Sequence, residues 1–195
     1  MDLHLFCSQN TPHMKKALIG SLVGAILVFG WQSTSHMFMH HHDAGYKQVI
    51  GQDSVIAAMS GFFKEEGQYM VPIHDLNAPQ EEKEKWMKDM EGKPWAQVVY
   101  HPAMKNDMVS NIIRSFGAAF LCVLVLIGIM GIKPGSFGTV FFKCIGAGFF
   151  SFMYILYNQH VWMQIPWAVV QGELIDAFVS WGLCGLWLGF YLKRK

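Results

Sequence analysis

Long apolar runs constrain the fold of this chain more than any other feature. A helix needs about 20 apolar residues to cross the roughly 30 Å hydrocarbon core of a bilayer. Residues 113–132, 137–157 and 165–192 form such runs, and residues 17–39 form a fourth when its polar end is counted as helix. The sequence therefore predicts an all-α membrane protein with four transmembrane helices and a small extramembrane insertion between the first two.

The composition agrees with this fold class. Hydrophobic residues make up 52% of the chain and charged residues only 15%, with a net charge of +1, whereas soluble domains carry about a quarter charged residues. The basic residues form no single patch, so nucleic acid is not an expected partner. The lipid bilayer is the first expected partner.

The first apolar run has an alternative interpretation as a secretory signal, because Lys15 and Lys16 precede it. No small-residue cleavage site follows, since the run ends in Trp31 and Gln32, and this favours a retained helix. Residues 1–16 are then a cytoplasmic N-terminal tail. The first 13 residues are either part of that tail or an upstream extension of the reading frame.

Lysine and arginine beside the helices predict the orientation. Four crossings bring Lys15, Lys16, Lys133 and the last three residues to one side, which the positive-inside rule makes the cytoplasm. Both termini are then cytoplasmic, and residues 40–112 lie outside, in the periplasm if the membrane is a bacterial inner membrane. None of the four cysteines falls in residues 40–112, so no disulfide framework is expected there.

Residues 40–112 predict a small periplasmic α+β cap. Their pattern indicates a helix from Asp53 to about Glu66, a strand over 68–73, a highly charged helix over 79–92 and a strand over 95–102. The two strands are expected to pair antiparallel, with the charged helix as their connection. A unit of this size is marginal alone, so it needs the membrane helices or a partner.

A predicted polar layer lies at the outer ends of the four helices. Counting about 20 residues from each cytoplasmic end brings an ionisable side chain of every helix to this depth. These residues are His36, Arg114, His160, Glu173 and Asp176. Arg114 is the only fixed cation available to the two carboxylates, so a proton, a histidinium or a metal must balance the second one.

Two interpretations of this layer stay open. In the first, ion pairs and hydrogen bonds form a structural seam that holds the helices in register. In the second, the layer is a metal site made of His36, His40, Glu173 and Asp176, because each pair shares a helix face at i,i+4 or i,i+3 spacing. Such a set suits zinc or iron, and the neighbouring methionines extend the choice to copper.

The histidine run, with Met37 and Met39, adds to the case for copper, but its last two members are expected to matter less in either interpretation. His41 and His42 are expected to point away from His36 or to lie beyond the helix end, and so to contribute less. Proton transfer or catalysis at the layer is a third possibility. No compact ligand motif such as His-Glu-x-x-His is present to support a metalloenzyme.

Several segments of the sequence resemble those of a known group of proteins. They are MKKALIGSLVGAILVFGWQ, GQYMVPI, KPWAQVVYHPAM and DAFVSWGLCGLWLGFYL. From Met14 onward the chain resembles small, uncharacterised inner-membrane proteins of Bacteroidetes-type bacteria. The resemblance implies the four-helix layout with an outward loop domain, and it implies no activity.

The sequence favours a non-enzymatic accessory or assembly subunit of a larger membrane complex, because no catalytic or nucleotide-binding motif is recognisable. Other membrane-protein subunits are then the expected partners. The alternative is a metal-binding or metal-handling membrane protein. A third interpretation, an intramembrane enzyme or small transporter, lacks the internal inverted repeat of many transporters.

Overall fold

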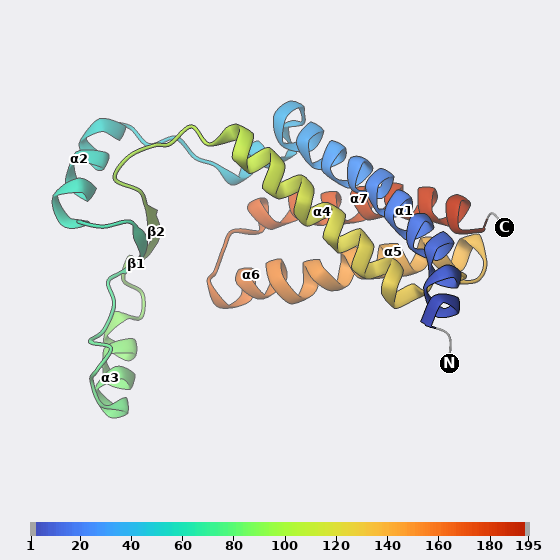
Figure 1. The fold of residues 1–195 in the computed structure, drawn as a ribbon. Coiled ribbons are helices and arrows are strands. Elements are labelled where there is room, and N and C mark those ends of the chain that lie inside the picture. Colours follow the sequence, from blue (N-terminus) through green and yellow to red (C-terminus); the bar gives the residue numbers. More distant parts are fainter. Residues whose placement is uncertain (1–2, 194–195) are drawn as a thin grey trace. The chain divides into compact units, whose positions relative to one another are not determined.

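The computed structural model describes residues 3–193, with their side chains from His13 onward. Within that part of the chain, four helices are long and apolar enough to cross a membrane (Figure 1): His13–Phe38, Met108–Met130, Phe137–Trp162 and Trp167–Lys193. The predicted set of four apolar helices is therefore confirmed, and the chain has the character of a multi-pass membrane protein. Its membrane and its orientation stay predictions.

The helices divide into several elements along the chain. They are α1 (Leu3–Phe38), α4 (Met108–Met130), α5 (Phe137–Ser151), α6 (Asn158–Trp162) and α7 (Trp167–Lys193). A π-helical turn, η2 (Phe152–Tyr157), joins α5 to α6 without a break. The predicted third helix therefore continues beyond residue 157.

The first helix ends at Phe38. Met39 is extended, with φ −105° and ψ 132°, and a short 3-10 helix, η1 (His40–Gly45), follows it. η1 folds against α7, where a side chain added at Gly45 would come within 3.0 Å of Val169. His40 is consequently not part of α1, although the sequence analysis treated it as helical.

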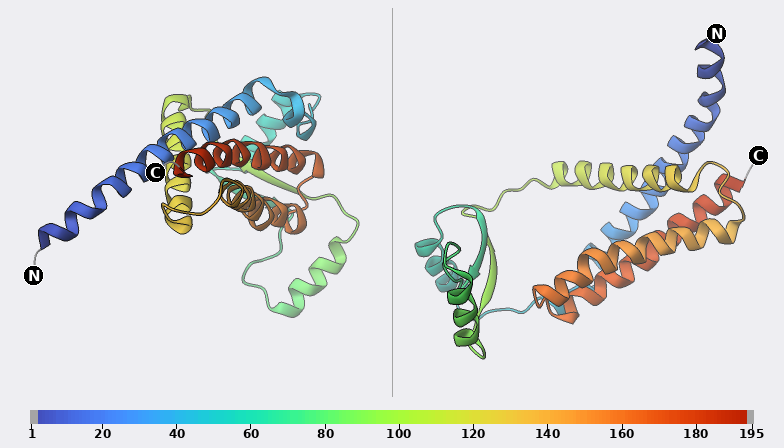
Figure 2. Two further views of the ribbon diagram at one scale, coloured as in Figure 1. Left: turned by 90° about the vertical axis from the view of Figure 1, so that its right-hand side faces the viewer. Right: turned by 90° about the horizontal axis from the view of Figure 1, so that it is seen from below.

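Helix α7 packs against α1 and α5, and α4 packs against α1 (Figure 2). Small residues allow close contact between α5 and α7, as is common in membrane helix pairs. A Cβ added at Gly148 of α5 would lie 2.5 Å from the Trp181 ring, and one at Gly189 of α7 would lie 2.6 Å from Phe137. The buried core includes Val123, Ile127, Val140, Cys144, Cys184 and Leu188.

Helix α4 contacts the bundle from Phe116 onward, where the Phe116 ring meets Phe29 of α1. Its buried residues run from Val123 to Met130, while residues 108–115 are all exposed. The beginning of α4 diverges from the other helices in Figure 2. Residues on its first two turns therefore lie away from the α1–α7 contact.

Residues 48–106 form a separate compact unit. It contains α2 (Gln52–Phe62), β1 (Gly67–Val71), α3 (Gln80–Met90) and β2 (Ala96–Tyr100). The strands pair antiparallel with Gly67 opposite Tyr100 and Val71 opposite Ala96. The predicted two-stranded sheet is thus confirmed, although the helix expected to reach Glu66 ends at Phe62.

An aromatic group holds this unit together. The Phe63 ring stacks on Tyr69 at 4.2 Å between centroids and meets Tyr100 at 5.5 Å. Tyr100 is buried, and its hydroxyl donates to Ser60 Oγ at 3.1 Å. The core of the unit is small, as expected for its length.

Candidate metal centre

The centre is built around Asp176, a fully buried carboxylate on α7. Trp31 Nε1 donates to Asp176 Oδ1 at 2.9 Å, and Ser35 Oγ donates to the same oxygen at 2.6 Å. Trp31 and Ser35 are four residues apart on α1 and so share one helix face. A buried carboxylate needs such donors, because unpaired burial of a charge is strongly unfavourable.

Three histidines converge on the same carboxylate through their Nε2 atoms. The distances to Asp176 are 3.1 Å from His42, 3.4 Å from His41 and 3.8 Å from His36. The His36 and His42 rings stack nearly parallel, with 4.0 Å between centroids, and His41 lies against His42 at 4.3 Å. The side chains range from 47% exposed for His36 to 11% for His42.

The end of α1 brings these side chains together. His36 lies on the last turns of α1, whereas His41 and His42 lie on η1, which returns the chain to Ser35 and α7. Gly172 of α7 leaves room for them, because an added Cβ would lie 2.7 Å from His42 Nδ1. The absence of a side chain at Gly172 therefore determines where His42 can lie.

A second carboxylate approaches His42 from its other side. Glu173 Oε1 lies 4.0 Å from His42 Nδ1, and its side chain is 31% exposed. His42 consequently stands between two carboxylates and directs a different ring nitrogen to each. Glu173 is the more accessible of the two.

The hydrogen-bond network assigns the tautomer of His42. The hydroxyl proton of Ser35 goes to Asp176, so both Ser35 Oγ and Asp176 Oδ2 act as acceptors toward the ring. His42 Nε2 lies 3.1 Å from each of them and therefore carries the proton. In the neutral ring the free lone pair is then on Nδ1, the nitrogen that faces Glu173.

Two groups of side chains have metal-ligand geometry. One consists of His36, His42 and Glu173, the other of His41, His42 and Asp176, and in each the donor atoms lie within 4.8 Å of one another. Two imidazoles and a glutamate form a known ligand set of zinc that leaves a fourth position open. The first group uses the free Nδ1 of His42, whereas the second requires its protonated Nε2.

Asp176 fits the role of a supporting acceptor. A histidine that binds a metal usually donates its other ring N–H to a carboxylate, which fixes the ring and raises its basicity. His42 makes this donation to Asp176, and Trp31 and Ser35 hold the carboxylate in place. The arrangement leaves Nδ1 of His42 facing Glu173, while the His36 ring stacks on the face of His42.

Three of the four predicted metal ligands lie around His42 but in two groups: His36 and Glu173 in one, and Asp176 in the other. His40 is outside both groups, exposed, and bonded to Asp43 at 2.8 Å. Its four-residue spacing from His36 does not place it on the same face because α1 ends between them. The expectation that His41 and His42 contribute less was wrong, since both contact Asp176.

Arg114 does not take the position that the sequence analysis gave it. It lies on the exposed first part of α4, and among residues 13–193 no ion pair joins it to Glu173 or Asp176. The depth of Arg114 along its helix matched the other polar residues, but the diverging course of α4 was not visible in the sequence. Imidazoles and neutral donors surround Asp176 instead.

His160 also lies outside the cluster. Its Nδ1 donates to the Ile165 carbonyl at 2.6 Å, and its ring packs edge-on against Trp167. These contacts stabilise the turn between α6 and α7. His160 therefore acts within this turn and not in the histidine cluster.

Comparisons with protein-family models, with curated proteins and with solved structures found no match to this chain. The resemblance to Bacteroidetes-type inner-membrane proteins therefore stays a prediction.

Proposed function

We propose that this chain is a metal-binding membrane protein that holds a transition metal ion, zinc in the first place, through His36, His42 and Glu173. The observation that carries the proposal is the orientation of His42. Its Nε2 is bound to the buried Asp176, so its Nδ1 faces Glu173, and the His36 ring stacks on its face with the donor atoms of His36, His42 and Glu173 within 4.8 Å of one another. Nitrogen and carboxylate donors of this kind suit zinc or iron.

The close stacking of the His36 and His42 rings supports a role as metal ligands rather than as a pair of cations. His36 and His42 stack at 4.0 Å between centroids, and two cations in that position would repel each other. Neutral imidazole is the form that binds metals. Glu173 supplies the negative charge that a divalent ion attracts.

The accessibility of the ligands favours exchange of the ion over permanent structural binding. His36 and Glu173 are 47% and 31% exposed, and three protein ligands leave a coordination position open to water or to another ligand. Structural zinc sites, in contrast, have four protein ligands and are closed. The proposed activity is therefore metal handling, with capture and release of the ion at the predicted outer end of the bundle.

Metal content of the purified protein tests this proposal. The protein is prepared in mild detergent without a histidine tag, dialysed against zinc, iron(II) or copper(II), and measured by elemental analysis. We expect about one zinc ion per chain, and His42→Ala should abolish it. His40→Ala is the matched control, because His40 is the adjacent, exposed histidine outside the cluster.

Two results would contradict the proposal. Wild-type protein without stoichiometric metal would do so, as would an equal loss of metal in His42→Ala and His40→Ala. Preferential binding of copper would keep the site but change the ion.

A second candidate function is that of an accessory or assembly subunit in a bacterial inner membrane, with both termini cytoplasmic. The observation in its favour is the surface of residues 48–106, where Tyr100 is the one buried residue of the described unit. Large apolar side chains are exposed there, among them Ile50, Phe62, Leu76, Met87, Val99 and Met104. A partner that covered these side chains would remove their apolar surface from water.

Native electrophoresis of the protein from its own membranes tests this second candidate. Co-migration with much larger proteins is expected if it is a subunit. Migration as a monomer or homodimer in several mild detergents would contradict it and would leave the metal proposal intact.

A further inference from the structure

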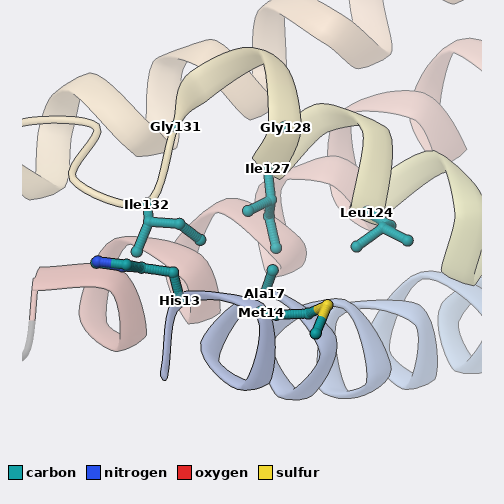
Figure 3. Close-up of a pocket in the computed structure, with 8 residues that line it drawn as sticks. All are labelled: His13, Met14, Ala17, Leu124, Ile127, Gly128, Gly131 and Ile132. Carbon is teal, nitrogen blue, oxygen red and sulfur yellow. The ribbon is translucent and has the colours of Figure 1, made fainter. Parts of the chain in front are cut away.

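A groove lies between α1 and α4 at the end of the bundle away from the histidines (Figure 3). Its volume is about 460 Å³. The lining residues are His13, Met14, Ala17, Leu124, Ile127, Gly128, Gly131 and Ile132. A Cβ added at Gly128 or Gly131 would meet no atom within 4 Å, so these two glycines leave the space open.

The charges of the bundle are separated along its length. Asp43, Asp107, Glu173 and Asp176 belong to the end with the histidine cluster, and residues 3–42, 108–172 and 177–193 contain no Asp or Glu. The end with the groove carries Lys15, Lys16, Lys133, Lys143 and Lys193 instead. Its side-chain charge is therefore positive.

Two of these lysines are next in sequence to residues that line the groove. Lys15 follows the lining residue Met14, Lys133 follows the lining residue Ile132, and both lysines are exposed. His13 adds an imidazole at the lining itself. An apolar groove beside several amines matches a molecule with an apolar tail and an anionic head.

We propose that this groove binds one anionic phospholipid, with an acyl chain along Ala17, Leu124 and Ile127 and its phosphate near Lys15 and Lys133. Basic pockets between membrane helices recognise anionic headgroups in this way. The positive-inside expectation places this end in the cytoplasmic leaflet, where anionic lipids are found.

A second copy of the chain is a poorer occupant. Two copies that met at this groove would bring two positively charged ends together, which is unfavourable. A free inorganic anion would leave the apolar lining unused. The combination of groove and charge therefore favours the lipid.

Lipid retention measured by native mass spectrometry tests the proposal on the full-length protein in detergent. Phosphatidylglycerol, phosphatidylcholine and inorganic phosphate are the three probes. We expect one phosphatidylglycerol to stay bound at concentrations where phosphatidylcholine does not. Lys15→Gln and Lys133→Gln should each weaken its binding about fivefold.

Gly128→Leu should remove binding by filling the groove. Gly138→Leu is its control, because Gly138 also has open space around it but lies on α5 outside the lining. Lys88→Gln on α3 is the control for charge. If Gly128→Leu does not fold, the two lysine variants still test the site.

Three outcomes would overturn the proposal. They are equal retention of phosphatidylcholine and phosphatidylglycerol, unchanged phosphatidylglycerol binding in the Gly128 or lysine variants, and competition by inorganic phosphate as strong as that by the lipid. None of them bears on the histidine cluster, so the metal proposal is tested separately.

Discussion

His42 donates from Nε2 to Asp176 Oδ2 at 3.1 Å, and this bond fixes which ring nitrogen is free to bind a metal. Asp176 is fully buried, whereas Glu173 on the other side of the ring and His36 stacked on its face are partly exposed. A buried acceptor thus orients a largely buried ligand that lies beside two partly exposed ones.

Replacement of Asp176 with Asn tests this relationship. The amide keeps the shape of the side chain but weakens its acceptance from His42, while His36, His42 and Glu173 remain. We expect zinc affinity to fall about 10- to 100-fold, as for other second-layer partners of metal-binding histidines. Competition with a chromogenic chelator measures it, and unchanged affinity would argue against the role of Asp176.

Gly172→Ala tests the space that His42 occupies. The added Cβ would lie 2.7 Å from His42 Nδ1, so the ring must move and the proposed ligand set is broken. We expect loss of stoichiometric zinc together with a loss of about 1–3 kcal/mol in stability from overpacking. Gly182→Ala is the control, since its Cβ would make an ordinary 3.4 Å contact with Ile145; equal zinc binding in both variants would contradict the account.

Trp31→Phe removes one of the two neutral donors to Asp176 Oδ1. The carboxylate is buried, so we expect the free energy of unfolding to fall by about 1–3 kcal/mol. Thermal unfolding in detergent measures this. Trp162→Phe serves as the control, because Trp162 is largely exposed; equal effects of the two variants would show that the bond contributes little.

Arg114→Ala should leave both stability and metal content nearly unchanged. Arg114 is exposed on α4 and, within residues 13–193, has no ion pair with the carboxylates of the cluster. If Arg114 instead paired with a buried carboxylate, its removal would destabilise the protein by about 3–5 kcal/mol. The free energy of unfolding of this one variant therefore distinguishes the observed arrangement from the predicted ion-pair seam.

The orientation of the chain is tested by fusion of a reporter that is active only in the periplasm. A fusion near Lys88 should be active and a fusion after Lys195 inactive, if the lysines at the ends of the helices face the cytoplasm. The reverse pattern would place the histidine cluster on the cytoplasmic side.

The sequence was informative where regular geometry holds. Helix rise is constant, so the count along each apolar run predicted a common depth for His36, Glu173 and Asp176, and each of the three lies against His42 in the structure. The antiparallel strands of residues 48–106 followed from alternation of apolar residues. Both features depend on local periodicity.

Positions that depend on the end of a helix or on its direction were not predictable in the same way. The end of α1 at Phe38 removed His40 from the face of His36, and η1 brought His41 and His42 to Asp176. Gly45 after the histidines is a signal for such a turn. The divergence of α4 that isolates Arg114 depends on packing between helices and has no comparable local signal.

X-ray absorption of the zinc-loaded protein identifies the ligands of the proposed centre. The account predicts a first shell of nitrogen and oxygen at about 2.0–2.1 Å with the multiple scattering of two imidazoles, and the loss of that signal in His42→Ala. A shell that contains sulfur at about 2.3 Å, or a zinc shell without imidazole, would place the metal elsewhere and contradict the proposed centre.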